Sequence, residues 1–258
     1  MLVGVTSRAQ TARPGGRPAR TRAGGNGGSV APPRGAAAGT PPDDAAAGRR
    51  PGAAVSRRTS PRGPHVEAAF YFDLCSPHAY LAAERALAVL PAPCEWQPIS
   101  SRLLPAAASF EAYRCEHALE AMRENVERRA AALALAPVRW PVPFPFDSDI
   151  AMLAATFAKR IGKTVAFALA AFRQAYAGGH ALSQPANVLI AGAACEMHPA
   201  AILQATRTRG LRTELERASS LALALGVIDV PAVRVGERVL VGEAALEEAG
   251  VLLAQARA

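Results

Sequence analysis

The sequence predicts an α/β domain in which a βαβ unit and a ββα unit are separated by a block of helices. Three features lead to this prediction. Short apolar runs flank one Ala/Leu-rich stretch between residues 66 and 99, and helical periodicity dominates from about 105 to 225. Two alternating segments and a last helical stretch then end the chain. This order differs from the regular βα alternation of a doubly wound sheet.

The first unit begins with a buried strand. The apolar run Ala68–Phe72 has the length and composition of such a strand and ends at Asp73. After a short turn, residues 78–90 carry leucines at helical spacing, and Pro77 suits the first helical turn. Residues 94–99, bounded by prolines and serines, predict a second strand.

The middle of the chain is predicted to be entirely helical. Residues 110–136 have acidic residues early and arginines late, as a helix dipole favours, and Pro137 ends the pattern. Prolines 141, 143 and 145 enforce an extended connection. Gly and Pro residues divide the remainder into five further helices, at 147–161, 163–177, 184–195, 199–208 and 211–225.

The last segment predicts a β-hairpin and a closing helix. Residues 231–235 and 238–241 alternate in the manner of strands, with Gly236-Glu237 as a tight turn between them. A helix from Glu243 to about Ala256 follows. The complete order indicates a thioredoxin-like sheet that is split by a helical insertion at about 105–225.

Residues 1–65 differ in composition from the rest of the chain. They contain 12 Gly, 9 Pro and 11 Arg, with two acidic residues and no extended apolar periodicity. Such a segment buries too little apolar surface to offset its chain entropy. We therefore predict that residues 1–65 form a disordered Arg/Gly/Pro/Ala-rich tail, either a solvated extension or a weak polyanion-binding arm, and that residues 66–258 form one domain.

Charge and hydropathy exclude several classes of function. The chain has 29 basic and 21 acidic residues, but residues 66–258 carry 18 and 19, so the folding part has no basic excess for nucleic acid. Its apolar runs are shorter than the roughly 18–20 residues that span a bilayer. The N-terminus lacks the apolar core of a secretory signal. We expect a cytoplasmic protein with neither a membrane nor a nucleic acid as its partner.

The four cysteines are widely spaced and form no CxxC pair, and none has a histidine at a ligand interval. The sequence therefore predicts neither a disulfide framework nor a metal site. Thiols in a reducing compartment are the expected state. These cysteines are Cys75, Cys94, Cys115 and Cys195.

The turn between the first strand and the first helix is the strongest candidate site. Free N–H groups and the positive end of the helix dipole favour an anion at this position, and a thiolate is such an anion. The Ser76 hydroxyl can donate a hydrogen bond to the sulfur of a substrate or cofactor and hold it ionised. The alternative is that Ser76 only caps the helix.

Several segments resemble one known family. Residues 70–73, Ser76-Pro77 and residues 80–82 are similar to the opening FYFDxxSPxxYLA of 2-hydroxychromene-2-carboxylate isomerases. These enzymes are relatives of kappa-class glutathione transferases within the DsbA-like thioredoxin superfamily. Three later segments are similar to the FP, AFxxxFxAxW and GVxGVP segments of that family, so that the resemblance covers about residues 66–250: Phe144-Pro145, residues 166–176 and Gly226–Pro231.

The resemblance implies a thiol cofactor and the residues that hold it. Ser76 corresponds to the serine that activates the glutathione thiol, and the Val230–Pro231 bond is expected to be cis. The backbone N–H and C=O of Val230 are expected to pair with the cysteine part of glutathione. Where the family has an Asp-Arg pair, this chain has Ala244-Ala245, which leaves Glu243 nearby. The expected cofactor is glutathione or another low-molecular-weight thiol.

The redox motif of the superfamily falls on Ser76–Ala79, so both of its sulfur positions are replaced. Disulfide exchange would then depend on Cys75, which is either a thiol activated beside the helix or a small buried side chain. His78 and Tyr80 are possible accessory residues. His78 either contacts an anion from the first helical turn or is bonded locally.

The resemblance implies an isomerase of the 2-hydroxychromene-2-carboxylate type. Its substrate is a small aromatic or electrophilic molecule, held in a pocket that the helical insertion forms over the Ser76 turn, and the resemblance implies a homodimer. Two alternatives stay open: a DsbA-like thiol-disulfide oxidoreductase that uses Cys75, and a non-catalytic thioredoxin-fold binding module.

Overall fold

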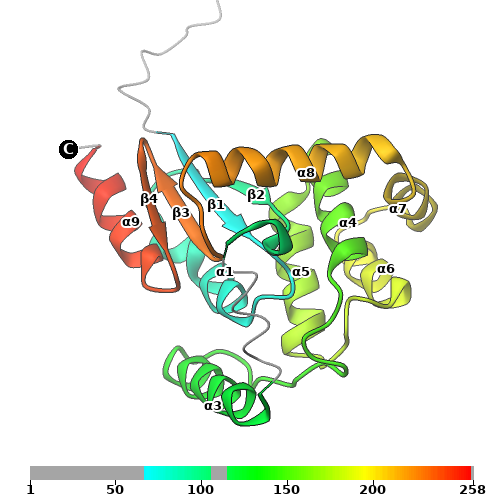
Figure 1. Ribbon diagram of the computed structural model, residues 1–258, viewed down its shortest axis with the longest axis horizontal. Coiled ribbons are helices and arrows are strands. Elements are labelled where there is room, and N and C mark those ends of the chain that lie inside the picture. The colour runs from blue at the N-terminus through cyan, green and yellow to red at the C-terminus, as the bar shows by residue number, and fades with distance from the viewer. Residues whose placement is uncertain (1–66, 106–114, 257–258) are drawn as a thin grey trace, which may run out of the picture. The chain divides into compact units, whose positions relative to one another are not determined.

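The computed structural model describes residues 67–105 and 115–256, and the tail predicted at 1–65 lies outside them. A four-stranded sheet has the order β2-β1-β3-β4 (Figure 1). β1 (Ala68–Phe72) is parallel to β2 (Glu95–Pro98) and antiparallel to β3 (Ala232–Val235), which pairs antiparallel with β4 (Arg238–Val241). The structure thus confirms the predicted α/β fold, with a βαβ half and a ββα half.

The helices between the two halves form the predicted insertion. In Figure 1, α4 to α7 lie beside the sheet, and α8 runs from them back toward the strands. The helical elements are α1 (Pro77–Val89), the 3-10 turn η1 (Ser101–Leu103), α3 (Glu116–Ala132), α4 (Asp149–Arg160), α5 (Thr164–Tyr176), α6 (Pro185–Ala193), α7 (Pro199–Thr206), α8 (Arg209–Ala224) and α9 (Ala245–Gln255).

The central strand β1 is buried on both faces. Because side chains alternate along a strand, Phe70 and Phe72 face the larger core, whereas Ala69 and Tyr71 face a second cluster beneath α8. The Phe72 ring lies 5.9 Å from that of Phe172 on α5. This packing anchors the end of β1, from which the Ser76 turn departs.

α1 begins as the sequence predicts. Ser76 is its N-cap, in extended conformation, and Pro77 occupies the first turn, where no intrahelical N–H bond is lost. The helix buries an alanine-rich face, including Ala79 and Ala83, against the core. Its 13 residues extend for about 20 Å.

Helix boundaries differ from the predictions by a few residues. Part of the helix predicted at 110–136 lies outside the described residues, and the described part ends at Ala132. Ala134 adopts a left-handed φ of 54°, and the Leu135 N–H returns to the carbonyl of Ala130. The helix therefore closes before Pro137 is reached. The 3-10 turn η1 was not predicted.

The extended connection before α4 contains two cis peptide bonds, Val142–Pro143 and Phe144–Pro145, that the sequence did not predict. The expected cis bond at Val230–Pro231 is confirmed. Within the described ranges, the structure contains no helix of the length and apolarity that crossing a membrane requires.

Candidate functional site

Ser76 lies at the start of α1 and faces the cis-proline loop. Its Oγ accepts a hydrogen bond from the N–H of Ala79 at 3.2 Å and donates to the carbonyl of Val230 at 3.4 Å. The side chain is therefore both a helix cap and a donor that reaches across to a loop 154 residues later. The N–H of His78 has no acceptor within the helix, so a second donor lies beside this hydroxyl.

A buried carboxylate shapes the turn before Ser76. Asp73 is fully buried, and its Oδ1 accepts the N–H of Cys75 at 3.0 Å. Its Oδ2 accepts both the N–H and the hydroxyl of Ser101, at 2.9 and 2.8 Å. Since the N–H of Ser76 also bonds the carbonyl of Asp73, the turn is held by hydrogen bonds along most of its length.

Cys75 points away from the position that a reactive thiol requires. It is buried, and its Sγ donates to the carbonyl of Phe146 at 3.1 Å. Burial raises the pKa of the thiol far above its ordinary value, and Asp73 raises it further. The thiolate is the reactive form, so the geometry favours the interpretation of Cys75 as a small buried side chain.

Val230 and Pro231 lie opposite Ser76, as the resemblance implies, but both backbone groups of Val230 are occupied. The carbonyl accepts from Ser76, and the N–H donates to Oδ1 of Asp229 at 2.7 Å. The carbonyl of Pro231 accepts from the N–H of Gly242, which connects the loop to the end of β4. The expected backbone donor and acceptor are present and bonded within the protein.

Two further titratable side chains, His78 and Asp229, lie near Ser76 in the sequence and in the cis-proline loop, respectively. Burial lowers the pKa of His78, although the nearby carboxylates of Glu243 and Asp229 act in the opposite direction. Burial raises the pKa of Asp229, against the effects of its bond to the Val230 N–H and of His78. His78 and Asp229 therefore influence each other's pKa, and Glu243 influences that of His78.

Glu243, the acid expected at the far end of the cofactor, is paired with arginines. Its carboxylate accepts from Nη2 of Arg129 at 2.6 Å, and Nη1 of Arg85 lies 3.5 Å from it. Arg129 belongs to α3, so this contact connects the helical insertion to the loop after β4. An incoming ammonium group would have to compete with two guanidinium groups.

Tyr80 lies in the core rather than in the site. It is 1% exposed, and its ring stacks on that of Tyr176 at 5.4 Å. The hydroxyl of Tyr176 donates to the carbonyl of Cys75 at 2.5 Å. The helical insertion therefore packs against the residue that precedes Ser76, in agreement with the predicted position of the insertion.

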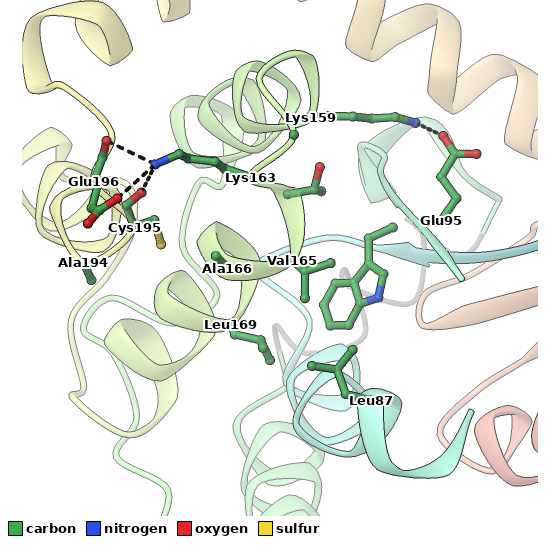
Figure 2. A pocket seen from close by; sticks show the side chains of 13 residues that line it. Leu87, Glu95, Lys159, Lys163, Val165, Ala166, Leu169, Ala194, Cys195 and Glu196 are labelled. Atoms are coloured by element: carbon green, nitrogen blue, oxygen red, sulfur yellow. Dashed lines mark hydrogen bonds and ion pairs between the residues drawn. The ribbon is translucent and has the colours of Figure 1, made fainter. Parts of the chain in front are cut away.

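A separate pocket of about 890 Å³ lies near the opposite end of α1 (Figure 2). Leu87, Val165 and Leu169 form its apolar wall. Its lysines point to partners of their own: Nζ of Lys163 donates to the carbonyl of Cys195 at 2.7 Å, and Lys159 pairs with Glu95 at 2.5 Å. These lysines are already paired within the protein.

Three residues of the site were not predicted from the sequence. Asp73 was placed at the end of a strand and in the FYFD segment without a role of its own, and its partner Ser101 is distant in sequence, so no local pattern connects them. Tyr176 matches the AFxxxFxAxW segment, but its hydrogen bond depends on the packing of α5. Asp229 had a signal, since it stands at the second glycine of GVxGVP. Among the described residues, no group of three or more His, Cys, Asp or Glu side chains could hold a metal ion.

Comparison with known proteins agrees with the fold. Residues 68–251 match the family of the DsbA-like thioredoxin domain. No curated protein matches the chain. A solved structure of 2-hydroxychromene-2-carboxylate isomerase is 18% identical, covers 73% of this chain and 94% of its own, and superimposes with a TM-score of 0.62.

A second solved structure, described as a probable DsbA oxidoreductase from Streptomyces coelicolor, is 17% identical. It covers 75% of this chain and 90% of its own, with a TM-score of 0.58. At such identities the likeness shows the fold alone. The family match covers most of the chain, and the protein therefore belongs to the DsbA-like thioredoxin domain family.

Proposed function

We propose that the protein is a thiol-dependent isomerase of the 2-hydroxychromene-2-carboxylate type, with glutathione or another low-molecular-weight thiol as its cofactor. The observation that carries the proposal is the Ser76 hydroxyl, which stands at the N-terminus of α1 and opposite the cis-proline loop. A hydroxyl at this position can donate to sulfur, but it cannot take part in disulfide exchange.

The residues present fit the sulfur end of such a cofactor. The Ser76 Oγ–H points to the Val230 carbonyl over 3.4 Å, a long hydrogen bond that the hydroxyl can exchange for a bond to a thiolate. The His78 N–H and the positive end of the helix dipole favour the same negative charge. The fit of a peptide portion is poorer, because the Val230 N–H is bonded to Asp229.

A bound thiol would supply a nucleophile for reversible addition to an electrophilic carbon of an aromatic or enone substrate. Ser76 would hold the sulfur and donate a hydrogen bond to it, which lowers the free energy of the ionised thiol relative to the protonated thiol. Asp73 and Tyr176 keep the turn rigid, since their bonds hold Cys75 and thereby orient its neighbour Ser76. The reaction is redox-neutral.

An oxidoreductase mechanism has less support. The two sulfur positions of the redox motif are Ser76 and Ala79, and Cys75 is a buried thiol with a raised pKa. Its S–H also donates a hydrogen bond to the backbone carbonyl of Phe146. A disulfide-exchange assay on the wild type, repeated with Cys75→Ser, tests this alternative directly.

The test measures thermal stability of the full chain with and without millimolar glutathione or cysteamine. A ligand at about 100 times its dissociation constant adds about 2.7 kcal/mol to the unfolding free energy. We expect a shift in the wild type and its loss in Ser76→Gly. Glycine caps a helix nearly as well as serine, so this variant keeps the cap to within a few tenths of a kcal/mol and loses mainly the hydroxyl with its bond to the Val230 carbonyl.

Ser76→Ala is the matched control for the helix cap. It loses both the hydroxyl and the cap, and should cost about 1 kcal/mol in the absence of a thiol. A thiol-induced shift that survives in Ser76→Gly would exclude the proposed role of Ser76. If a thiol binds, isomerisation of 2-hydroxychromene-2-carboxylate is followed by absorbance, and light scattering tests the proposed homodimer.

A further inference from the structure

The N–H of Val230 is the backbone donor that a peptide-like thiol would use, and in this protein it is already bonded. It donates to Oδ1 of Asp229 at 2.7 Å. This distance is at the short end for an N–H···O bond, as expected for an ionised acceptor. A ligand must displace the Asp229 carboxylate before it can pair with this amide.

Displacement of this carboxylate is unfavourable because of its surroundings. Asp229 is partly buried, and this burial raises the pKa of its carboxyl because the ionised form loses hydration. Loss of a hydrogen bond by a desolvated carboxylate costs free energy, because water does not fully replace the lost bond. The nearby His78 has a lowered pKa and provides little positive charge to compensate.

The position expected to bind the ammonium end of glutathione is also occupied by contacts within the protein. Glu243 is the acid expected near the ammonium end of glutathione, and its carboxylate accepts from Arg129 and faces Arg85. Both contacts that would recognise a glutathione molecule beyond its sulfur are therefore satisfied internally. The hydroxyl of Ser76 is buried and donates to the Val230 carbonyl over 3.4 Å, so a sulfur atom has to replace that carbonyl as its acceptor.

We propose that Asp229 determines which thiol the Ser76 site accepts, because its hold on the Val230 N–H disfavours peptide-like thiols such as glutathione and favours small thiols without a peptide backbone. This inference rests on the proposed function, since it requires that Ser76 bind a thiol. Because one side chain sets the preference for small thiols over glutathione, a single substitution at Asp229 should weaken that preference.

The experiment titrates glutathione and cysteamine against the wild type, Asp229→Ala and Asp229→Asn, using thermal stability of the full chain. Alanine frees the Val230 N–H, and one hydrogen bond to a charged group corresponds to about a tenfold change in affinity. We expect Asp229→Ala to bind glutathione about tenfold more tightly and cysteamine within about twofold of the wild type. Asparagine keeps an oxygen acceptor for the Val230 N–H, so the glutathione affinity of Asp229→Asn should increase less than that of Asp229→Ala.

The outcomes separate this inference from the proposed function. Ser76-dependent binding of cysteamine, with unchanged glutathione affinity in Asp229→Ala, overturns the inference alone. An equal gain in both Asp229 variants also overturns it, because the effect would then come from charge. If neither thiol stabilises any of the chains, the proposed function fails and the inference fails with it.

Hydrogen exchange at the Val230 amide provides a measurement that needs no thiol. The Asp229 carboxylate should protect this amide in the wild type, and protection should fall in Asp229→Ala while the amides of β3 keep theirs. Equal exchange rates in the two chains would show that Asp229 does not hold the N–H, and would overturn the inference even if the thiol titration agreed with it.

Discussion

The surroundings of the two ends of α1 differ in polarity and in hydrogen bonding. At the N-terminal end, Ser76 lies among buried polar groups from four segments of the chain, and each has a defined hydrogen-bond partner. At the other end, the pocket beside Leu87 is mostly apolar, and its lysines form ion pairs with Glu95 and Glu196.

The difference teaches that volume alone does not identify the site. A pocket of about 890 Å³ can hold a small molecule, but its lysines are already paired within the protein. The Ser76 turn brings a buried hydroxyl and the N-terminus of α1 within hydrogen-bonding reach of the cis-proline loop. Three predictions test whether the polar groups at the two ends differ in this way.

The largest effect is expected for Asp73→Asn. The asparagine amide has one oxygen acceptor and one NH₂ donor in place of two oxygen acceptors. The NH₂ group therefore faces a hydrogen-bond donor, either the Cys75 N–H or the N–H and hydroxyl of Ser101, and that donor loses its acceptor. A buried donor without a partner costs about 1–3 kcal/mol. Urea unfolding should therefore show a loss of about 1–3 kcal/mol. A loss below about 0.5 kcal/mol would mean that the turn does not depend on this carboxylate.

A smaller, pH-dependent effect is expected at His78. Its pKa in the folded protein lies below the ordinary 6.5, so between these two values the unfolded chain binds more protons than the folded chain. The unfolding free energy should therefore fall as the pH decreases below about 6.5.

This pH dependence should be weaker in His78→Asn, which retains Asp229 and Glu243. The stability difference between wild type and variant should shrink on acidification from pH 7 to 5, by less than about 1.4 kcal/mol per pH unit. Urea unfolding at several pH values measures it. Parallel pH profiles for the two chains would show that His78 is not held in its neutral form.

The smallest effect is expected for Glu95→Gln at the pocket end, which is the matched control for Asp73→Asn. Glu95 is 62% exposed and pairs with Lys159, and exposed pairs contribute roughly 0–1 kcal/mol. The unfolding free energy should change by no more than about 0.5 kcal/mol, and the thiol-induced thermal shift should stay as in the wild type. A thiol shift that disappears in this variant would move the binding site from Ser76 to the pocket.

Much of the fold was predictable because its signals are local. The apolar run of β1, Pro77 at the start of α1 and the Gly236 turn each depend on a few neighbouring residues, and all three occur as predicted. The end of α3 was predicted too late, because Pro137 is the visible stop signal whereas Ala134 closes the helix by a backbone conformation that the sequence does not mark.

The sequence by itself determined the α/β order and marked the Ser76 turn as the candidate site, since both follow from residue type and spacing, whereas the replacement of both redox cysteines follows from the resemblance to the DsbA-like superfamily. Only the tertiary structure decided that Cys75 is buried against Phe146, that Asp73 holds Ser101 and that Asp229 occupies the Val230 amide. Burial and hydrogen bonding set the reactivity of a side chain. Both depend on segments that meet only after the chain has folded.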